Sequence, residues 1–315
     1  MPELPEVETI KRGLGKFILN KKIVQVEQRC EKSFIGQPDW VAGATVVALR
    51  RRGKALLIDL DNGYTMMVHL RMTGQLIWRS DSLAGVMHEM RAQTADAPVA
   101  DVAILPQTFD PEQQFAAGHP SKNFIEELPN QQTRVIFVFN DGKLYFNDQR
   151  KFGFVKVLKT EAVEQDSFIA GLGKEPWVMP AEEFYKICMQ HKNALIKAVL
   201  LDQKLIAGLG NIYADESLFY AGVHPERRAG TLTEAEVAKI LEGACKVMDA
   251  SIDSGGSTMA TYYRPDGSTG DYLEKFAQVF RREGQPCNRC GTEIVKMRVA
   301  GRGTHVCPHC QIREA

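Results

Sequence analysis

The sequence contains no long apolar run. Its 315 residues include no stretch approaching the roughly 20 apolar residues that a membrane-spanning helix needs. The beginning also lacks the continuous apolar segment of a cleavable signal peptide. These absences argue against a membrane-spanning helix and predict a cytosolic protein whose thiols are reduced. The length is sufficient for two domains with cores of their own.

The sequence also lacks net charge, because 39 basic side chains balance 39 acidic ones. This balance argues against a polyanionic partner, but the charges are unevenly distributed. Residues 80–130 hold eight acidic and two basic side chains, which leaves 37 basic and 31 acidic elsewhere. Residues 281–315 alone carry seven basic and three acidic side chains. The body of the chain is therefore basic, which is weak evidence because most charge runs are only solvated faces.

Helical segments are missing between the β-rich runs of the first half. These runs are KKIVQVEQ, ATVVALRRRG, ALLIDL, YTMMVHL, RVIFVF and KLYF. Turn residues at 61–63 and 140–142 join two pairs of runs, which favours antiparallel hairpins. The pattern argues against a parallel doubly wound sheet and favours a sandwich or barrel. Residues 80–130, rich in Ala, Gln, Asp and Pro, interrupt it, and we expect most of this segment to be an inserted, mobile excursion.

Helices are predicted on both sides of the β-rich region. Near the start, Pro5 and Glu6 favour a helix N-terminus, since proline suits the first turn and a carboxylate offsets its positive end. An apolar face follows at helical spacing: Val7, Ile10, Leu14, Phe17 and Ile18. A helical region begins between residues 160 and 180, and Thr233 with Glu236 forms a capping-box signature.

Four of the seven cysteines form two close pairs. CNRC and CPHC give the spacing C-x2-C-x16-C-x2-C, which suits tetrahedral zinc in a ribbon. The alternatives are four unrelated core cysteines or two disulfides, and disulfides fit a cytosolic chain poorly. A closed four-cysteine site is structural. We therefore predict one structural zinc ion per chain, held by Cys287, Cys290, Cys307 and Cys310.

A glycine-flanked asparagine opens another predicted helix in AGLGNIYADESLF. Asn211 has two interpretations at this point. It is either the N-cap of the helix or part of a backbone cradle that binds an anion at the helix start. A DNA phosphate would suit the second interpretation.

Several motifs together resemble one family. PELPEVET, RRGK, HLRMTG, RKFG, GLGNIYADESLF, GGST and the terminal ribbon follow the order typical of formamidopyrimidine-DNA glycosylases and span nearly the whole chain. The endonuclease VIII group shares this layout, but PELPEVE resembles the formamidopyrimidine branch. The resemblance implies a monomer that acts on double-stranded damaged DNA in the bacterial cytosol, near the nucleoid and without a membrane partner.

The resemblance also implies an α+β fold with three parts. Residues 1–160 would form a catalytic antiparallel β-sandwich with flanking helices and an insertion at about 80–130. Residues 161–280 would form a helical DNA-binding domain with a helix-two-turns-helix, and its residues 255–276 would include a lesion-covering loop. Residues 281–315 would form the zinc ribbon.

The implied activity is that of a bifunctional DNA glycosylase and abasic-site lyase in base excision repair. In the family the initiator methionine is removed and the nitrogen of the following proline, here Pro2, attacks the sugar. An α-amino group has a pKa near 7.7 to 8.0, so a useful fraction is neutral at physiological pH. Glu3 would transfer protons. Excision of oxidised purines, such as 8-oxoguanine and formamidopyrimidines, would be followed by β- and δ-elimination.

Three further residues carry catalytic roles by resemblance. Lys54 would assist the acid-base chemistry of elimination, Arg302 would approach the lesion phosphates, and Glu6 would order the site. From the residues alone, a solvated turn lysine is the favoured interpretation of Lys54, and a surface cation is the alternative for Arg302.

The resemblance assigns Met72, Arg150 and Phe152 to a wedge that fills the space left when a nucleotide rotates out of the duplex. Periodicity alone would also allow Met72 and Phe152 to be core positions on strands.

Other positions are expected to contact DNA phosphates. Asn211 is one of them. Gln132 stands where the family commonly has a histidine, and Asn193 stands near a usual basic position. Lys192 and Lys197 lie close to Asn193 in sequence and are predicted to substitute for that contact.

Two other functions remain open from the sequence. One is an endonuclease VIII-like glycosylase that prefers oxidised pyrimidines. The other is a protein that binds damaged DNA without catalysis, which would follow if Met1 were retained and made the Pro2 nitrogen a tertiary amide.

Overall fold

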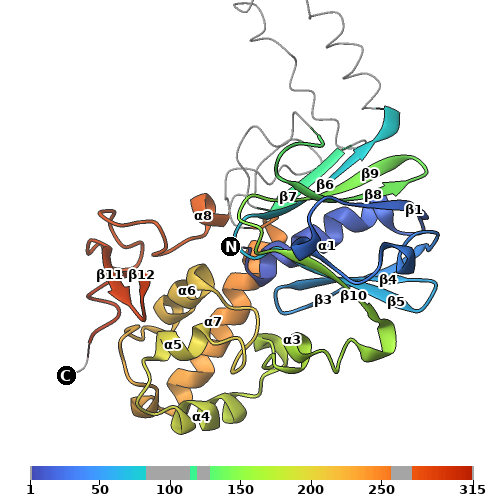
Figure 1. The fold of residues 1–315 in the computed structure, drawn as a ribbon. Coiled ribbons are helices and arrows are strands. Elements are labelled where there is room, and N and C mark those ends of the chain that lie inside the picture. The colour runs from blue at the N-terminus through green and yellow to red at the C-terminus, as the bar shows by residue number, and fades with distance from the viewer. Residues whose placement is uncertain (1, 83–113, 119–127, 257–271, 314–315) are drawn as a thin grey trace, which may run out of the picture. The chain divides into compact units, whose positions relative to one another are not determined.

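The computed structural model describes residues 2–82, 114–118, 128–256 and 272–313, which form two compact units (Figure 1). The first unit contains Pro2 and the described residues from Thr9 to Val163. The second contains Glu3–Glu8 and the described residues from Glu164 onward. The predicted lesion-covering loop lies mostly outside the described residues.

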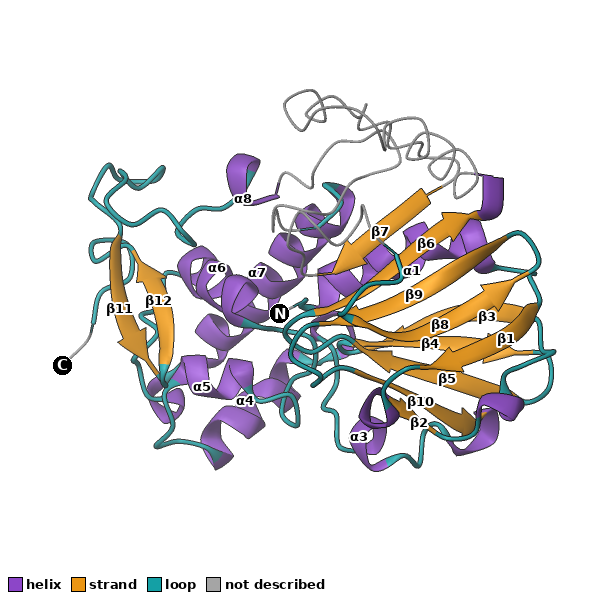
Figure 2. Ribbon diagram, turned by 45° about the horizontal axis from the view of Figure 1, so that its top comes forward, coloured by secondary structure: helices purple, strands orange, loops and turns teal. Residues whose placement is uncertain are grey.

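The first unit is a sandwich of two five-stranded sheets (Figure 2). One sheet has the order β1 (Ile23–Gln28), β8 (Thr133–Phe139), β9 (Gly142–Asp148), β6 (Gly74–Ser80) and β7 (Gln114–Gly118). The other has the order β2 (Phe34–Ile35), β10 (Phe154–Lys159), β5 (Tyr64–His69), β4 (Ala55–Leu60) and β3 (Val46–Arg52). The ladders are antiparallel except the short β2–β10 pair. The rings of Phe34 and Phe137 join the layers, with centroids 6.3 Å apart.

The strand registers bring several segments to one end of this sandwich. In the β4–β5 hairpin, Leu56 pairs with Val68, so Lys54 and His69 lie at the same end. Phe154 pairs with His69 across β5 and β10. In the other sheet Gly74 pairs with Asp148. Segment 70–73 connects β5 to β6, and segment 149–153 connects β9 to β10. Both segments therefore lie at this same end of the sandwich.

Strand β7 lies within residues 80–130, where the sequence predicted no strand. Phe115, Ala116 and Ala117 are buried in β7, which pairs with β6 at the edge of the sheet. A short run without polar alternation gave no strand signal in the sequence. Residues 83–113 and 119–127 lie outside the described part of the chain.

Helix α1 (Leu4–Ile18) begins at the place that the sequence predicts. Its apolar face is buried as expected. The Phe17 ring lies 6.3 Å from Trp78 and 5.9 Å from Phe115, so the later part of the helix packs on the β6–β7 side of the first sheet.

The second unit is helical and ends in a two-stranded ribbon. Its helices are α3 (Ser167–Ala170), α4 (Ala181–Gln190), α5 (Ile196–Leu201), α6 (Asn211–Ala221), α7 (Glu234–Asp253) and α8 (Tyr272–Lys275). The ribbon pairs β11 (Val295–Val299) with β12 (Arg302–Val306). The predicted capping box of Thr233 and Glu236 is confirmed at α7. No helix in the described ranges is long and apolar enough to cross a membrane.

The core of the second unit surrounds α6. Every residue from Ile212 to Phe219 is buried. Phe184 of α4 and Ile240 of α7 belong to the same core as Leu218, and so does Leu4 at the beginning of α1. A helix buried on all sides has little freedom to shift, which makes α6 a rigid support.

Candidate active site and metal centre

The start of α1 holds Glu3 in a defined position. Pro2 and Glu3 are both buried. The backbone N–H of Glu3 donates to Oε2 of Glu6 at 2.8 Å, which is the second half of a capping box. Leu4 donates its N–H to the carbonyl of Gly208 at 3.2 Å. These contacts fix the backbone directly after Pro2.

The carboxylate of Glu3 lies at the N-terminus of α6. Its Oε1 accepts a hydrogen bond from the N–H of Ile212 at 3.0 Å. A helix N-terminus favours negative charge, so this end stabilises the ionised carboxylate. Gly210 makes the approach possible, because a Cβ there would lie 2.2 Å from Cδ of Glu3.

Glu6 is held by a tyrosine that the sequence did not single out. The hydroxyl of Tyr213 donates to Oε1 of Glu6 at 2.6 Å and lies 2.6 Å from Oγ of Ser251. Burial and the nearby carboxylates raise the pKa of Tyr213 well above its ordinary value. The tyrosine therefore remains a proton donor that orients Glu6.

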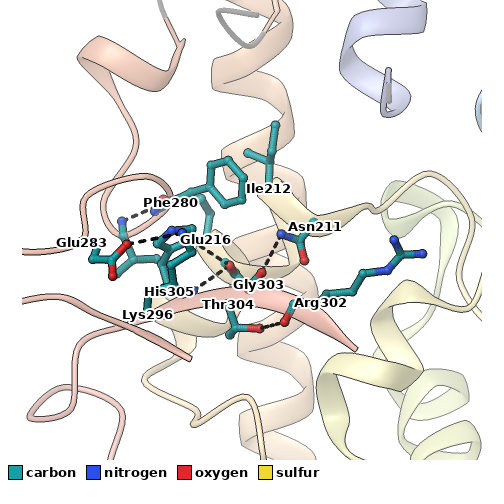
Figure 3. A network of polar contacts seen from close by, with 12 residues as sticks. Asn211, Ile212, Glu216, Phe280, Glu283, Lys296, Arg302, Gly303, Thr304 and His305 are labelled. Atoms are coloured by element: carbon teal, nitrogen blue, oxygen red, sulfur yellow. Dashed lines mark hydrogen bonds and ion pairs between the residues drawn. The ribbon is translucent and has the colours of Figure 1, made fainter. Parts of the chain in front are cut away.

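Asn211 does not cap α6, so the N-cap interpretation is wrong. The N-cap is Gly210, and Asn211 is the first helical residue. Its Nδ2 instead donates to the carbonyl of Gly303 at 2.8 Å (Figure 3). This bond ties the start of α6 to the zinc ribbon next to Arg302. The anion-binding role of Asn211 stays a prediction.

Arg302 opens strand β12, and its side chain is exposed and points away from the contacts of its own backbone (Figure 3). The hydroxyl of Thr304 donates to its carbonyl at 3.1 Å. The N–H of His305 donates to Oδ2 of Asp215 at 3.0 Å, which anchors the strand to α6.

Lys197 is a correction to the predicted DNA contacts. Its side chain is fully buried, and its Nζ lies 2.5 Å from Oδ1 of Asp215 and 2.6 Å from Oγ1 of Thr304. An ammonium enclosed in this way cannot reach a phosphate. Lys192, by contrast, is exposed in the turn after α4, and its role stays a prediction.

In the first unit, Lys54 is buried, so its interpretation as a solvated turn lysine is wrong. It follows Gly53, whose φ of +55° forms the tight turn between β3 and β4.

His69 lies at the same end of the hairpin and was not predicted, although it begins the motif HLRMTG. Its Nδ1 accepts from the N–H of Arg71 at 3.1 Å. Burial, followed by the positive charges of Arg71 and Lys54, lowers the pKa of His69 to about 3. The imidazole is therefore neutral at physiological pH and serves as an acceptor.

Met72 lies in the turn after β5 and Phe152 in the loop after β9, with 39% and 57% of their surfaces exposed, so the alternative that they are core positions is wrong. Arg150 is also exposed, and its Cζ lies 5.0 Å from the centroid of the Phe152 ring. Its N–H donates to Oγ1 of Thr73, the neighbour of Met72, at 3.1 Å. Exposed apolar side chains beside an arginine form a surface suited to insertion into a base stack.

The four ribbon cysteines converge on one point. Their sulfur atoms all lie within 4.8 Å of one another, with Cys287–Cys310 at 4.0 Å and Cys290–Cys307 at 3.5 Å. Sulfurs bound to a tetrahedral zinc at about 2.3 Å would be about 3.8 Å apart, whereas a disulfide needs about 2.05 Å. The geometry therefore fits zinc and excludes disulfides.

Backbone and side-chain donors surround the sulfur atoms of this centre, while burial raises the pKa of Cys307 and of Cys310. The N–H of Cys310 lies 3.4 Å from Sγ of Cys307, and that of Arg289 lies 3.4 Å from Sγ of Cys287. Hydrogen bonds with Thr292 lower the pKa of Cys290 to about 6. A bound zinc ion would join the two halves of the ribbon, and with four protein ligands it would leave no position for a substrate.

Family models match three consecutive parts of the chain. The formamidopyrimidine-DNA glycosylase N-terminal domain matches residues 1–155, and the H2TH domain of the same enzymes matches residues 172–263. A zinc finger found in FPG and IleRS matches residues 284–312. Together with the sulfur geometry, this match confirms the prediction of one structural zinc site.

Individual proteins are similar over their whole length. A formamidopyrimidine-DNA glycosylase of Desulfitobacterium hafniense is 35% identical, covering 99% of this chain and 100% of the relative. A mutant of Lactococcus lactis FPG in complex with Fapy-dG containing DNA is 31% identical, with a TM-score of 0.79 and coverage of 99% and 100%. The wild-type Lactococcus lactis protein with an oxidized pyrimidine containing DNA is 29% identical, with a TM-score of 0.77 and the same coverage.

These similarities confirm the predicted α+β fold and the predicted kind of enzyme. The chain belongs to the formamidopyrimidine-DNA glycosylase family of DNA-repair enzymes.

Proposed function

We propose that the protein is a bifunctional glycosylase and abasic-site lyase that excises oxidised purines, such as 8-oxoguanine and formamidopyrimidines, from double-stranded DNA. After removal of Met1, the secondary amine of Pro2 attacks C1′ of the damaged nucleotide and the base departs. The adduct then loses the amine proton, and opening of the C1′–O4′ bond, with O4′ taking up a proton, gives an iminium. This iminium is an electron sink that makes the neighbouring sugar proton acidic, so β- and then δ-elimination cleave the strand.

The observation that carries the proposal is the placement of Glu3. Its carboxylate is buried directly after Pro2 and is held by the N–H of Ile212 at the positive end of α6. A carboxylate fixed beside the proposed nucleophile is suited to moving protons to and from the sugar. Glu6 supports it through the N–H of Glu3.

The remaining assignments extend this proposal. Buried Lys54 and exposed Arg302 assist elimination, the first as a proton-transfer group and the second as a cation for the lesion phosphates. Met72, Arg150 and Phe152 form the wedge that fills the space left by the extruded nucleotide. Asn211 and Lys192 are the other proposed contacts to DNA.

We also propose separate roles for three consecutive parts of the chain. Residues 1–160 carry the nucleophile, residues 161–280 bind DNA and residues 281–315 form the zinc ribbon. The protein acts as a monomer in the cytosol.

Reductive trapping tests the proposed nucleophile. A reductant added during turnover should convert the iminium into a stable amine that links protein and DNA, and the linked peptide should begin at Pro2. Retention of Met1, checked by intact mass, should abolish the link, and Pro2→Gly should weaken it. Glu3→Gln should impair base excision while an abasic substrate is still trapped. A cross-link through Lys54 with none through Pro2 would make the lysine the nucleophile instead.

A second candidate substrate is an oxidised pyrimidine, because a similar protein has been crystallised with such DNA. Excision of oxidised purine and oxidised pyrimidine from otherwise identical duplexes separates the two. Absence of excision and of trapping with both substrates would leave a protein that only binds damaged DNA.

A further inference from the structure

We propose that Asp148 is a positioning residue that, together with Thr73, fixes the surface formed by Met72, Arg150 and Phe152. This inference rests on the wedge role given to that surface in the proposed function. Asp148 is the last residue of β9, and its side chain is completely buried although the segment that follows is exposed.

The carboxylate of Asp148 holds both loops that carry the wedge. Its Oδ1 accepts from the hydroxyl of Thr73 in a short hydrogen bond and from the N–H of Arg150 at 3.2 Å. Its Oδ2 accepts from the N–H of Gly153 at 2.7 Å. One side chain therefore joins the loop after β5 to both ends of the loop after β9.

The backbone of Asp148 is itself anchored. Its N–H donates to the carbonyl of Gln132 at 2.9 Å, and its carbonyl accepts from Nε of buried Arg134 at 2.7 Å. Asp148 also pairs with Gly74, the residue after Thr73, in the β6–β9 ladder. The carboxylate is thus a fixed point from which the loops are held.

The loops need such an anchor because their side chains do not pack inward. Met72, Arg150 and Phe152 are exposed, and Lys151 between the last two has a φ of +57°, an unfavourable value for a residue with a side chain. Hydrogen bonds to a buried carboxylate are among the stronger ones. They keep the loop in one conformation before DNA arrives, which lowers the entropy lost when the wedge is inserted.

Asparagine at this position would keep the size but lose one acceptor. Its amide nitrogen would face the N–H of Arg150 or the N–H of Gly153, groups that can only donate, so one hydrogen bond that holds the loop after β9 would be lost. We expect Asp148→Asn to slow base excision from duplex DNA by roughly 10-fold or more, as for loss of a charge-assisted hydrogen bond. Cleavage at a pre-formed abasic site, where no stacked base must be replaced, should change by less than about 3-fold.

The experiment uses the zinc-loaded full chain under single-turnover conditions. Both reactions are measured in the same duplex sequence, and fluorescence of 2-aminopurine beside the lesion reports extrusion of the nucleotide. Thr73→Val should reproduce the selective loss and the weaker fluorescence change, and Thr73→Ser should restore them. Asp141→Asn, at the exposed turn at the other end of β9, is the matched control.

A variant without the wedge side chains distinguishes a failure of the positioning role of Asp148 from a failure of the wedge role. In Met72→Ala/Arg150→Ala/Phe152→Ala, adding Asp148→Asn should slow excision no further, because it acts through those side chains. A further loss of the same size, or equal losses on both substrates, would overturn the positioning role. If Asp148→Asn does not fold, absence of any selective effect of Thr73→Val would overturn it equally. If Met72→Ala/Arg150→Ala/Phe152→Ala itself has no selective effect, the wedge role in the proposed function is wrong, and the inference about Asp148 is wrong with it.

Discussion

The ammonium of Lys197 and the carboxylate of Asp215 lie 2.5 Å apart with both side chains fully buried. Burial lowers the pKa of Lys197, while the negative charge of Asp215 opposes that shift. The ammonium also contacts Thr304, and Asp215 accepts from the N–H of His305. The pair therefore connects α5, α6 and the strand that begins with Arg302.

Removing one member of this pair should be costly. Lys197→Met leaves a buried carboxylate without its counterion and should lower the free energy of unfolding by about 3–5 kcal/mol. Adding Asp215→Asn should restore part of the loss, because the amide is neutral and keeps an oxygen for His305. Urea unfolding of the single and double variants measures this, and a double variant as unstable as the sum of both singles would refute the coupling.

Gly210 provides a separate test of the position of Glu3. Gly210→Ala would place a Cβ about 2.2 Å from the Glu3 carboxyl carbon, so the carboxylate must move. Displacement of a reacting group by about 1 Å can cost roughly 100-fold in rate, and we expect a loss of base excision of that order. Gly15→Ala in α1 is the control, because nothing lies within 4 Å of its Cβ position. Equal excision rates for both variants would contradict the assigned role of Glu3.

His69 should make stability depend on pH. Its pKa in the folded protein is about 3, whereas in the unfolded chain it is about 6.5. The unfolded state therefore binds more protons between these values, so the stabilisation is complete above about pH 6.5 and falls as pH drops toward 3. The slope for this group is at most about 1.4 kcal/mol per pH unit. His69→Gln should flatten the curve in urea unfolding between pH 5 and 7, and parallel curves would refute the assignment.

Zinc should be required for the ribbon to fold. The apolar core beneath it is small and consists of Phe219, Val279 and Ile294 around the buried cysteines, too little to hold the strands without metal. A strong chelator should release one zinc per chain and weaken DNA binding, measured by a colorimetric zinc assay and fluorescence anisotropy. A metal-free protein with an ordered ribbon and unchanged affinity would contradict this.

Local patterns predicted much of the fold. The hairpin strands, the start of α1, the capping box at α7 and the cysteine spacing all depend on neighbouring residues, so the sequence alone identified them. Strand β7 was not predicted from the sequence, because a short run of mostly small apolar residues has no distinctive period.

The site was harder to predict because burial and long-range contacts decide it. Lys197 reads as a cation available to DNA until Asp215 is seen beside it, although its apolar neighbours were a signal of burial. Asn211 reads as a cap because the distant acceptor at Gly303 is invisible in the sequence. His69 begins the motif HLRMTG and Asp148 stands two residues before RKFG, but their roles depend on partners that only the fold brings near.

Helix α6 holds two proposed catalytic residues of the chain in fixed positions, one directly and one through a strand. The N–H of Ile212 holds Glu3, and Asp215, three residues later, holds the strand of Arg302. These two anchors are separated by roughly 4.5 Å along the helix axis. A substitution that rotates or slides this helix would displace both attachments together, so compensation by a second change at either one alone would fail.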